Sequence, residues 1–383
     1  MRIRFLLHDV FGKAGGVKTV TLALARDLAQ WHEVELTSLY GGGNPVHALP
    51  PGVSVRTLID RNSAQSRVQR TLAHLPSQVI PGPEPRIKQY SAYTDLVLLR
   101  YLRSLRGGAV VTMQPGLNMA LARLGTNKYV RVAQDHRPFI SRPQSTLSAY
   151  EKYAHRYDAF LALTNEDSAH YRQLVGTRTR IETMSNGAPP LTGNPSSLDS
   201  KVVVAAGRLE ASKGFDLLVR AWSVVAPVHP DWELRIFGEG AQRQRLERLI
   251  AQRGLEGQVR LMGFTKHLES EMTAASLFVL SSRMEGYPMV LLEAMGCGLP
   301  LVSTDCPAGG PRDIITDGVN GFLVPNEDVT ALADAIIRAI GLDADTRKSM
   351  GGAALVRARD RSHLAVAQQW CALLTELARN KRG

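Results

Sequence analysis

Two carboxylates, Glu285 and Glu293, stand on either side of a predicted helix start. Met289–Met295 is a run of good helix formers, and Pro288 is typical of a first helical residue, because its missing N–H would have no partner there anyway. Glu293 would then lie about 7.5 Å along the helix from its start, at ~1.5 Å per residue. The N–H groups and positive dipole at that start favour an anion. The pattern therefore indicates a site for a sugar that is joined to a nucleotide through phosphate.

An arbitrary pair of acids with this spacing is more often a loop acid and an acid on a solvated helix face. Here the residues that precede the pair favour a site. A strand of buried character, 275–282, runs directly into the loop that holds Glu285. Ligands of open parallel sheets bind beyond the carboxyl ends of the strands, which is where this loop would lie.

A turn with two cations follows another predicted strand, Val202–Ala206. Gly207 and Gly214 flank the turn, and Arg208 and Lys213 lie within it. Two fixed cations at the carboxyl end of a strand are suited to hold a diphosphate between them. The alternative is a solvated basic turn, which we disfavour because the Glu285 segment belongs to the same predicted sheet.

A third segment at a strand end, Gly263 and Phe264, follows the predicted strand 259–264. It offers main-chain edges and an aromatic ring to a nucleobase. A turn glycine followed by a core phenylalanine is an equally good interpretation of the same two residues.

Near the N-terminus, a strand over residues 2–7 leads to Gly15 and Gly16 and then to a helix from Lys18 to about Trp31. Paired glycines at a helix start let a ligand phosphate approach the main chain, although a tight turn without a ligand would look the same. His136 also follows a predicted strand, and a hydrogen-bonded structural histidine is the simpler interpretation of a single His.

Alternating strands and helices of this length predict an α/β fold of two Rossmann-like units, each with a doubly wound parallel sheet. The turn-rich span 186–197 separates them. We predict an N-terminal domain over 1–187, a C-terminal domain over 188–362 and a C-terminal helix over 363–383. A single helical stretch is expected from Val329 to about Arg359.

Residues 61–106 appear irregular up to a helix over 93–106, which carries Arg100, Arg103 and Arg106. Such a helix either presents its cations to an anionic membrane or acceptor, or packs its leucines on the sheet and leaves the arginines solvated.

The chain has 383 residues, a net charge of +11 and a sequence pI near 9.8. This balance favours an acidic partner, but the sequence contains no nucleic-acid-binding motif, and we expect no nucleic-acid partner. Its three cysteines have no zinc-like spacing, so no protein-held metal and no cofactor is expected. The sequence contains no membrane span or signal pattern, which predicts a cytoplasmic protein with at most a peripheral contact on the inner face of the membrane.

The sequence resembles the retaining glycosyltransferases of family 4, which have the GT-B fold of two Rossmann-like domains facing a cleft. The resemblance rests on four segments in the family's order: Gly207–Gly214, Gly238–Gly240, Glu285–Glu293 and Asp317–Val324. It implies that the first domain binds the acceptor, the second binds the donor, and the C-terminal helix packs back on the first domain.

The resemblance also implies a role for each site residue. Arg208 and Lys213 would hold the diphosphate as it leaves, Glu285 would contact sugar hydroxyls and Glu293 the ribose. The remaining positions would bind the donor or lie near the transferred sugar: Gly15, Gly16, His136, Gly207, Gly263, Phe264, Tyr287, Pro288, Met289 and Val290.

The implied reaction is metal-independent transfer of a hexose from a nucleotide sugar, with UDP as the expected nucleotide, to a hydroxyl of a glycan, a lipid-linked acceptor or a small molecule. The alternatives are an epimerase or hydrolase of nucleotide sugars on the same fold, and a non-catalytic nucleotide-sugar-binding protein. The four charged residues Arg208, Lys213, Glu285 and Glu293 disfavour the non-catalytic alternative, because all of them are present.

Overall fold

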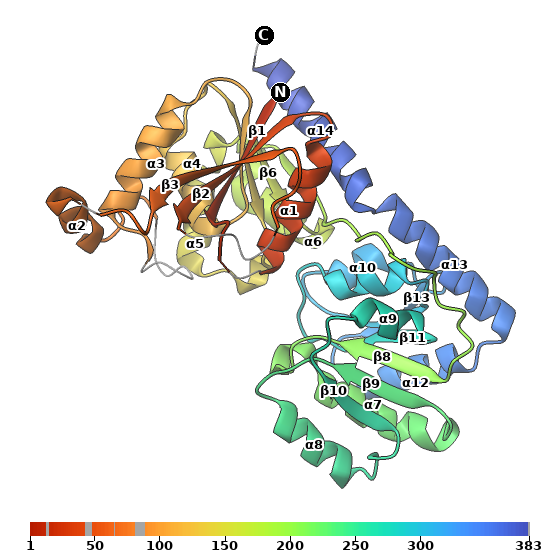
Figure 1. Ribbon diagram of the computed structural model, residues 1–383. Helices are drawn as coiled ribbons and strands as arrows, with labels where there is room; N and C mark the ends of the chain where they lie inside the picture. Colours follow the sequence, from red (N-terminus) through yellow and green to blue (C-terminus); the bar gives the residue numbers. More distant parts are fainter. Residues whose placement is uncertain (13–14, 43–47, 65, 81–88, 382–383) are drawn as a thin grey trace. The chain divides into compact units, whose positions relative to one another are not determined.

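The computed structural model describes residues 1–12, 15–42, 48–64, 66–80 and 89–381. The chain divides into two compact units (Figure 1). The first is Met1–Ser185 together with the last helix, α14 (His363–Asn380), and the second is Asn186–Ser362. The division falls two residues before the predicted boundary at 187/188.

The first unit has a parallel sheet of seven strands in the order β3-β2-β1-β4-β5-β6-β7. The strands are β1 (Arg2–Asp9), β2 (Glu33–Gly41), β3 (Val53–Asp60), β4 (Ala109–Thr112), β5 (Val130–Asp135), β6 (Ala159–Ala162) and β7 (Ile181–Thr183). The helices between them are α1 (Gly16–Leu28), α2 (Arg67–His74), α3 (Ala92–Ser104), α4 (Pro115–Leu124), α5 (Gln144–Tyr153) and α6 (Asn165–Val175).

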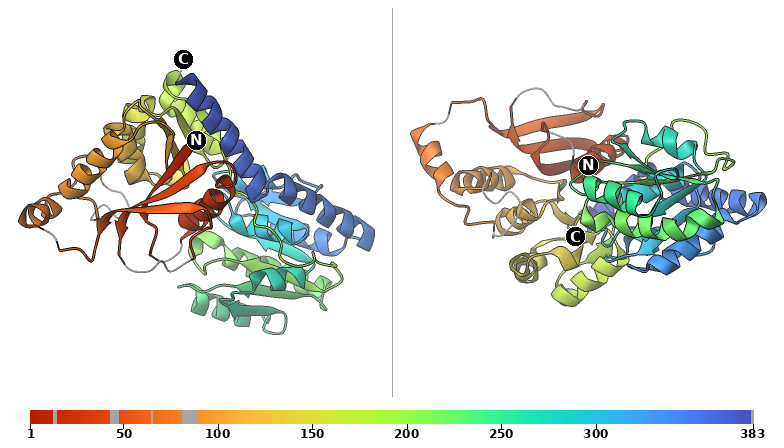
Figure 2. Two further views of the ribbon diagram at one scale, coloured as in Figure 1. Left: turned by 45° about the horizontal axis from the view of Figure 1, so that its top comes forward. Right: turned by 90° about the horizontal axis from the view of Figure 1, so that it is seen from below.

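Helices cover both faces of this sheet, which explains why the inner strands β4 and β6 are buried at every residue. Phe5 of β1 belongs to the core shared with α1 and α14, whereas its neighbour Leu6 belongs to the opposite core, shared with α3 and α4. Trp370 of α14 meets Phe5 edge to face, with ring centroids 6.4 Å apart. In both Figure 1 and the left view of Figure 2, the blue α14 lies beside the red α1, with which it is in contact.

The second unit has a parallel sheet of six strands in the order β10-β9-β8-β11-β12-β13. The strands are β8 (Val202–Ala206), β9 (Glu233–Phe237), β10 (Val259–Gly263), β11 (Leu277–Leu280), β12 (Leu301–Asp305) and β13 (Gly321–Pro325). The helices are α7 (Phe215–Val228), α8 (Arg243–Gln252), α9 (Leu268–Thr273), α10 (Met289–Gly296), α11 (Gly310–Ile314), α12 (Val329–Ile340) and α13 (Ala344–Asp360).

This sheet is also covered on both faces. Val203 of β8 packs in one core with Trp222 of α7 and Ile336 of α12, all fully buried. On the other face, α10 contacts β11 and β12 and buries Leu292. Each unit therefore has its own core on a doubly wound sheet, as predicted. In both sheets the strand order 3-2-1-4-5-6 places the carboxyl ends of β1 and β4, or β8 and β11, at the switch point where ligands of such folds bind.

Three local predictions were wrong. The region before α3 is not irregular, because it contains α2, whose start is fixed by a capping box between Ser66 and Gln69. The single helical stretch predicted from Val329 is two helices, since α12 ends at Gly341 and the Asp343 side chain caps α13 by accepting from the Thr346 N–H. Pro288 has extended backbone angles and is the N-cap of α10, not its first helical residue.

Helix α3 buries leucines and exposes its cations, an arrangement that both predicted alternatives share. Leu98 and Leu102 are fully buried, whereas Arg100, Arg103 and Arg106 are exposed. Within the described part of the chain, none of the helices combines the length and the apolar character needed to cross a membrane.

Candidate active site

The turn after β8 and the loop after β11 are in close contact in the second unit. Gly214 has a left-handed φ of +61°, and a Cβ there would lie 1.9 Å from the Ser281 carbonyl oxygen. Only glycine fits such an approach without displacing the main chain. The Ser281 hydroxyl donates to the Lys213 carbonyl oxygen at 3.1 Å. Lys213 is thus fixed next to the segment that carries Glu285.

Lys213 and Glu285 form an ion pair between Nζ and Oε1. The Ser282 hydroxyl donates to the same Oε1 at 2.8 Å. The main chain of Glu285 is also held, because its N–H donates to the Pro307 carbonyl and its carbonyl accepts from the Ala308 N–H, each at 2.9 Å. Two of the residues predicted to work together are therefore in direct contact, and Glu285 has little freedom to move.

The N-terminus of α10 begins directly after this loop. Its N-cap, Pro288, provides no side-chain hydrogen bond to the first turn. Because the first N–H groups of a helix have no partner within the helix, those of Met289 and Val290 can serve an anion. Tyr287 is buried, and its hydroxyl accepts from Arg361 Nη1 at 2.6 Å. This geometry is suited to a phosphate close to Lys213.

Arg208 differs from Lys213 in its exposure. Its side chain is 74% exposed and pairs with Glu210, with 2.6 Å between Nη1 and Oε1. An exposed ion pair of this kind contributes little to stability, so the guanidinium can be redirected to a bound anion at low cost. Arg208 follows β8, on the same turn as Lys213.

A pocket of about 330 Å³, here called the Phe264 pocket, opens at the carboxyl ends of β8, β9 and β10. Its lining residues are Ala206, Gly207, Arg208, Phe237, Gly238, Glu239, Phe264, Thr265 and Leu268. Phe264 is 73% exposed, which excludes the interpretation of a core phenylalanine. Gly263 before it has φ +77°, so it makes the turn that presents the ring. The pocket is of the size that small ligands occupy.

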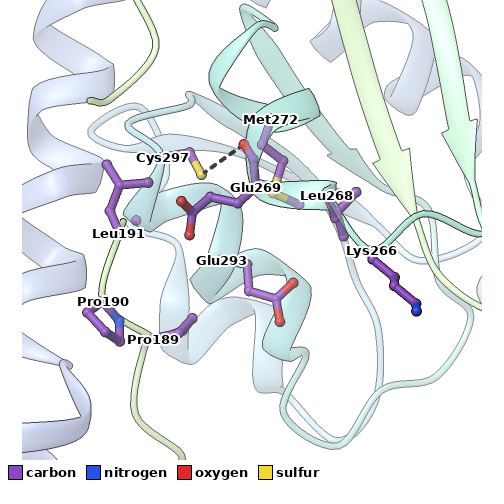
Figure 3. A pocket seen from close by; sticks show the side chains of 10 residues that line it. Pro189, Pro190, Leu191, Lys266, Leu268, Glu269, Met272, Glu293 and Cys297 are labelled. Carbon is purple, nitrogen blue, oxygen red and sulfur yellow. Dashed lines mark hydrogen bonds between the residues drawn. The ribbon is translucent and has the colours of Figure 1, made fainter. Parts of the chain in front are cut away.

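A second pocket, the Glu293 pocket, adjoins the first because Leu268 lines both. It measures about 190 Å³ and is lined by Pro189, Pro190, Leu191, Lys266, Leu268, Glu269, Met272, Glu293, Gly296 and Cys297. Burial raises the pKa of the Glu293 carboxyl. Figure 3 shows the carboxylates of Glu269 and Glu293 turned to different sides, with Glu269 on the side of Leu191 and Cys297. Glu293 is therefore not the solvated helix-face acid of the simpler interpretation.

Gly15 and Gly16 lie at the carboxyl end of β1 in the first unit. Gly15 is the N-cap of α1, where no side chain caps the helix. Among the residues that the structure describes, none beyond the adjoining chain has an atom within 4 Å of a Cβ added to either glycine. Open space next to a helix N-terminus agrees with the predicted approach of a phosphate, but the packing itself does not demand glycine here.

His136 follows β5 in the same unit, and its neighbours determine which nitrogen carries the proton. Gln134 donates from Nε2 to the Met184 carbonyl at 2.7 Å, so its Oε1 is the acceptor that faces His136 Nε2 at 3.1 Å. The proton therefore lies on Nε2, and Nδ1 keeps a lone pair. Desolvation lowers the pKa of His136 to about 4, although the nearby Asp135 charge acts in the opposite direction. The imidazole is neutral at pH 7.

Sequence reasoning missed Ser282 and the ion pair between Arg283 and Asp216. Ser282 had a local signal, since a hydroxyl three residues before Glu285 can reach its carboxylate. Asp216 gave no signal, because its partner is 67 positions away. In the described part of the chain, no three His, Cys, Asp or Glu side chains gather as metal ligands would.

Comparison with solved structures defines the fold class. The structure of an S. aureus TarM mutant in complex with fondaparinux, α-GlcNAc-glycerol and UDP superposes with a TM-score of 0.73 over 97% of this chain and 99% of that chain. The two sequences are only 14% identical, so this likeness concerns the fold. Together with the two Rossmann-like sheets, it identifies the GT-B fold.

Sequence comparison then shows which family the second unit resembles. Residues 182–356 match the model of the glycosyl transferases group 1. An exopolysaccharide phosphotransferase of Streptomyces coelicolor is 34% identical over 98% of this chain, but the chain spans only 41% of that protein. The D-inositol 3-phosphate glycosyltransferase of Kribbella flavida is 26% identical over 91% of this chain and 87% of its own length. Residues 182–356, which cover most of the second unit, are thus similar to the glycosyl transferases group 1.

Proposed function

We propose that the protein is a retaining glycosyltransferase that moves a hexose from a UDP-sugar to a hydroxyl of a glycan, a lipid-linked acceptor or a small molecule. The observation that carries the proposal is the contact of Lys213 with Glu285 beside the uncapped N-terminus of α10. One cation, one carboxylate and a helix N-terminus are brought to the same edge of the sheet. The Phe264 and Glu293 pockets, which lie along that edge, have room for the base and ribose of the nucleotide.

The chemistry requires stabilisation of a leaving diphosphate. When the bond between the anomeric carbon and the diphosphate oxygen breaks, its electron pair stays on the diphosphate. Lys213 and Arg208 would stabilise this negative charge, as would the N–H groups of Met289 and Val290. The acceptor oxygen forms its new bond on the same face of the sugar, and its proton passes to the leaving phosphate oxygen. Retention of configuration follows from this front-side attack.

The two carboxylates have separate tasks in this proposal. Glu285 would accept hydrogen bonds from sugar hydroxyls, and Glu293 would accept them from the ribose. A glycosidase-like pair would have to flank the anomeric bond at ~5 to 9 Å with one acid and one nucleophile or base. We assign neither role to these two acids. Lys213 and Ser282 both bond to Oε1 of Glu285. Glu293 lies in a different pocket.

Lys213 has to serve two partners in turn. Before the donor binds, its ammonium is neutralised by Glu285. A diphosphate that reaches the N-terminus of α10 would compete for that ammonium and release Glu285 Oε1 for the sugar. Donor binding would therefore exchange one ion pair for another, and hydrogen bonds from Ser282 and the sugar hydroxyls would replace the ammonium as partners of the Glu285 carboxylate.

The first unit would bind the acceptor, with Gly15 and Gly16 against the donor phosphates or the acceptor. His136 would lie near the transferred sugar and accept a hydrogen bond at Nδ1. Polyol phosphates are suitable first acceptors to test, because one relative is named for inositol 3-phosphate and the net charge of +11 favours an anion. A peripheral contact of α3 with an anionic membrane belongs to the same proposal, as do a cytoplasmic location and a transfer without metal or cofactor.

The test is to incubate the protein with UDP-glucose, UDP-galactose and UDP-N-acetylglucosamine, with and without a panel of glycan and polyol-phosphate acceptors, and to quantify UDP and UMP separately. We expect UDP release that depends on an acceptor, is unchanged by EDTA and gives a product with the anomeric configuration of the donor.

Other outcomes would identify other functions. UMP as the nucleotide product would mean transfer of a sugar phosphate, the kind of reaction that the name of the Streptomyces relative suggests. Donor consumption that no acceptor changes would mean a hydrolase or an epimerase. Strict dependence on a divalent ion would contradict the metal-independent step.

A further inference from the structure

Arg283 connects the two loops that carry Lys213 and Glu285. Its Nη1 and Nη2 donate to Asp216 Oδ1 and Oδ2 at 2.8 and 2.9 Å, which is a bidentate pair. Asp216 lies in the first turn of α7, directly after the turn that carries Lys213. A planar guanidinium fixes a carboxylate in orientation as well as in distance, which a lysine ammonium cannot do.

The same arginine also holds the main chain just before Lys213. Its backbone N–H donates to the Ser212 carbonyl at 2.8 Å, and Nη1 donates to the Ala211 carbonyl at 2.8 Å. These bonds hold both residues that precede Lys213 in the short 3₁₀ helix Ala211–Lys213. The loop that carries Glu285 thus also fixes the position of the Lys213 Cα.

Arg283 is itself held from a third direction. Its carbonyl accepts from Asn326 Nδ2 at 3.1 Å, and its Nε pairs with Glu327 at 2.9 Å. The side chains of Arg283 and Asp216 are 27% and 18% exposed, so solvent screens their bond only in part. Desolvation alone would raise the pKa of Asp216, but the bonds from Arg283 outweigh it and the pKa is lowered.

We propose that Arg283 is a positioning residue that sets the placement of Lys213 relative to Glu285 through Asp216 and the carbonyls of residues 211 and 212. The proposal rests on the proposed donor role of Lys213. A lysine side chain is flexible, so its reach is reproducible only if its main chain is fixed. A displacement of about 1 Å in a group that stabilises a transition state can cost about 10²-fold in rate.

The test is a double-mutant cycle between Arg283→Lys and Lys213→Ala, measured first as UDP affinity by calorimetry and then as acceptor-dependent UDP release. If Arg283 acts through Lys213, Arg283→Lys should weaken UDP binding about tenfold and slow transfer about 10²-fold in the parent protein. In the Lys213→Ala background the same change should have almost no further effect, because the group it positions is gone.

Two further variants keep the outcome interpretable. Asp216→Asn retains the shape of the pair but loses its charge, so it should reproduce the pattern of Arg283→Lys. Arg235→Lys is the matched control, because Arg235 makes a similar two-bond pair with Glu233 in β9, at 3.1 and 3.2 Å, with side chains 29% and 21% exposed. We expect unchanged UDP affinity and transfer for Arg235→Lys, and thermal unfolding should verify that each variant is folded.

Equal losses from Arg283→Lys in the two backgrounds would overturn the proposal, since they would mean a general structural role. Full UDP affinity and transfer in Arg283→Lys would overturn it as well. Failure of the proposed function would give a different result. The parent protein and Arg235→Lys would then both bind UDP but release none from any donor. The double-mutant cycle in UDP affinity could still be measured.

Discussion

Lys213 and Glu285 are separated by 72 positions in the chain and form an ion pair at the carboxyl edge of the second sheet. The contact depends on the parallel order of β8 and β11, because the loops that follow neighbouring parallel strands emerge at the same edge. The pair joins a cation suited to a diphosphate with an acceptor suited to sugar hydroxyls.

Lys213→Ala should reduce donor turnover by about 10² to 10³-fold, the usual cost of removing one preorganised group that stabilises developing charge. Glu285→Gln should also lose activity, because the amide cannot replace the charged acceptor next to Lys213. Thermal unfolding and UDP release should be measured on the same preparations. Full turnover in either folded variant would show that the site assignment is wrong, and Arg235→Lys serves again as the control.

Glu293→Gln should have opposite effects on stability and on binding. Because burial raises the folded-state pKa of Glu293 above the unfolded value, its ionisation costs stability as the pH rises through the window between the two values, and the cost is complete above the folded-state pKa. The glutamine should therefore raise the melting temperature without ligand. It should weaken UDP binding by about tenfold, as expected for the loss of a charged acceptor.

The comparison for Glu293→Gln is Glu256→Gln, at an exposed position of the same unit. Unaltered UDP affinity in Glu293→Gln, measured by calorimetry at pH 7, would remove Glu293 from the nucleotide site. An unchanged melting temperature of Glu293→Gln would contradict only the prediction that ionisation of the buried carboxyl costs stability.

His136 should remain neutral down to about pH 4, with its proton on Nε2. Nitrogen chemical shifts of labelled histidine would show this tautomer directly. Since the folded pKa lies below the unfolded value of ~6.5, stability should be complete above about pH 6.5 and should fall as the pH decreases towards 4. His136→Asn should reduce this pH dependence in urea unfolding. Titration of His136 near 6.5 would contradict the prediction.

Gly214→Ala should destabilise the protein and lower activity together. The added Cβ would have to lie 1.9 Å from the Ser281 carbonyl in a left-handed conformation, and backbone strain of that kind alone costs on the order of 1 to 3 kcal/mol. Relief of the clash would displace Lys213. Gly257→Ala is the control, because its Cβ would meet nothing within 4 Å. Equal melting temperatures for the two variants would disprove the close contact.

The proposed membrane contact of α3 can be tested by co-sedimentation with vesicles of phosphatidylglycerol and phosphatidylcholine at low salt. If the contact exists, exchange of Arg100, Arg103 and Arg106 for glutamine should reduce binding severalfold, because each cation near an anionic surface contributes ~1 kcal/mol. The same exchange at the exposed Arg245, Arg248 and Arg253 controls for net charge. Equal binding by both triple variants would exclude a specific role of α3.

The sequence by itself determined the fold class and the placement of several candidate residues at strand ends. Strands of parallel sheets that are buried on both faces leave continuous apolar runs, and the glycine-flanked turns that follow them are visible in the chain. Gly207, Arg208 and Lys213 after β8 and Glu285 after β11 could therefore be placed at strand ends. These signals are local, so they can be read without knowledge of distant residues.

The tertiary structure decided which of these residues meet and what holds them. Lys213 meets Glu285, and Arg283 meets Asp216, only because distant parts of the chain are brought together. The tautomer of His136 depends on Gln134, whose orientation is fixed by the distant Met184 carbonyl. The wrong predictions for α2 and for the helical stretch after Val329 had the same origin. Helix α2 has no buried residue that would reveal a helical period. The break at Gly341 becomes visible only when α12 and α13 pack as separate helices. Side-chain pairing across strand ends is a property of the sheet order, which no single segment encodes.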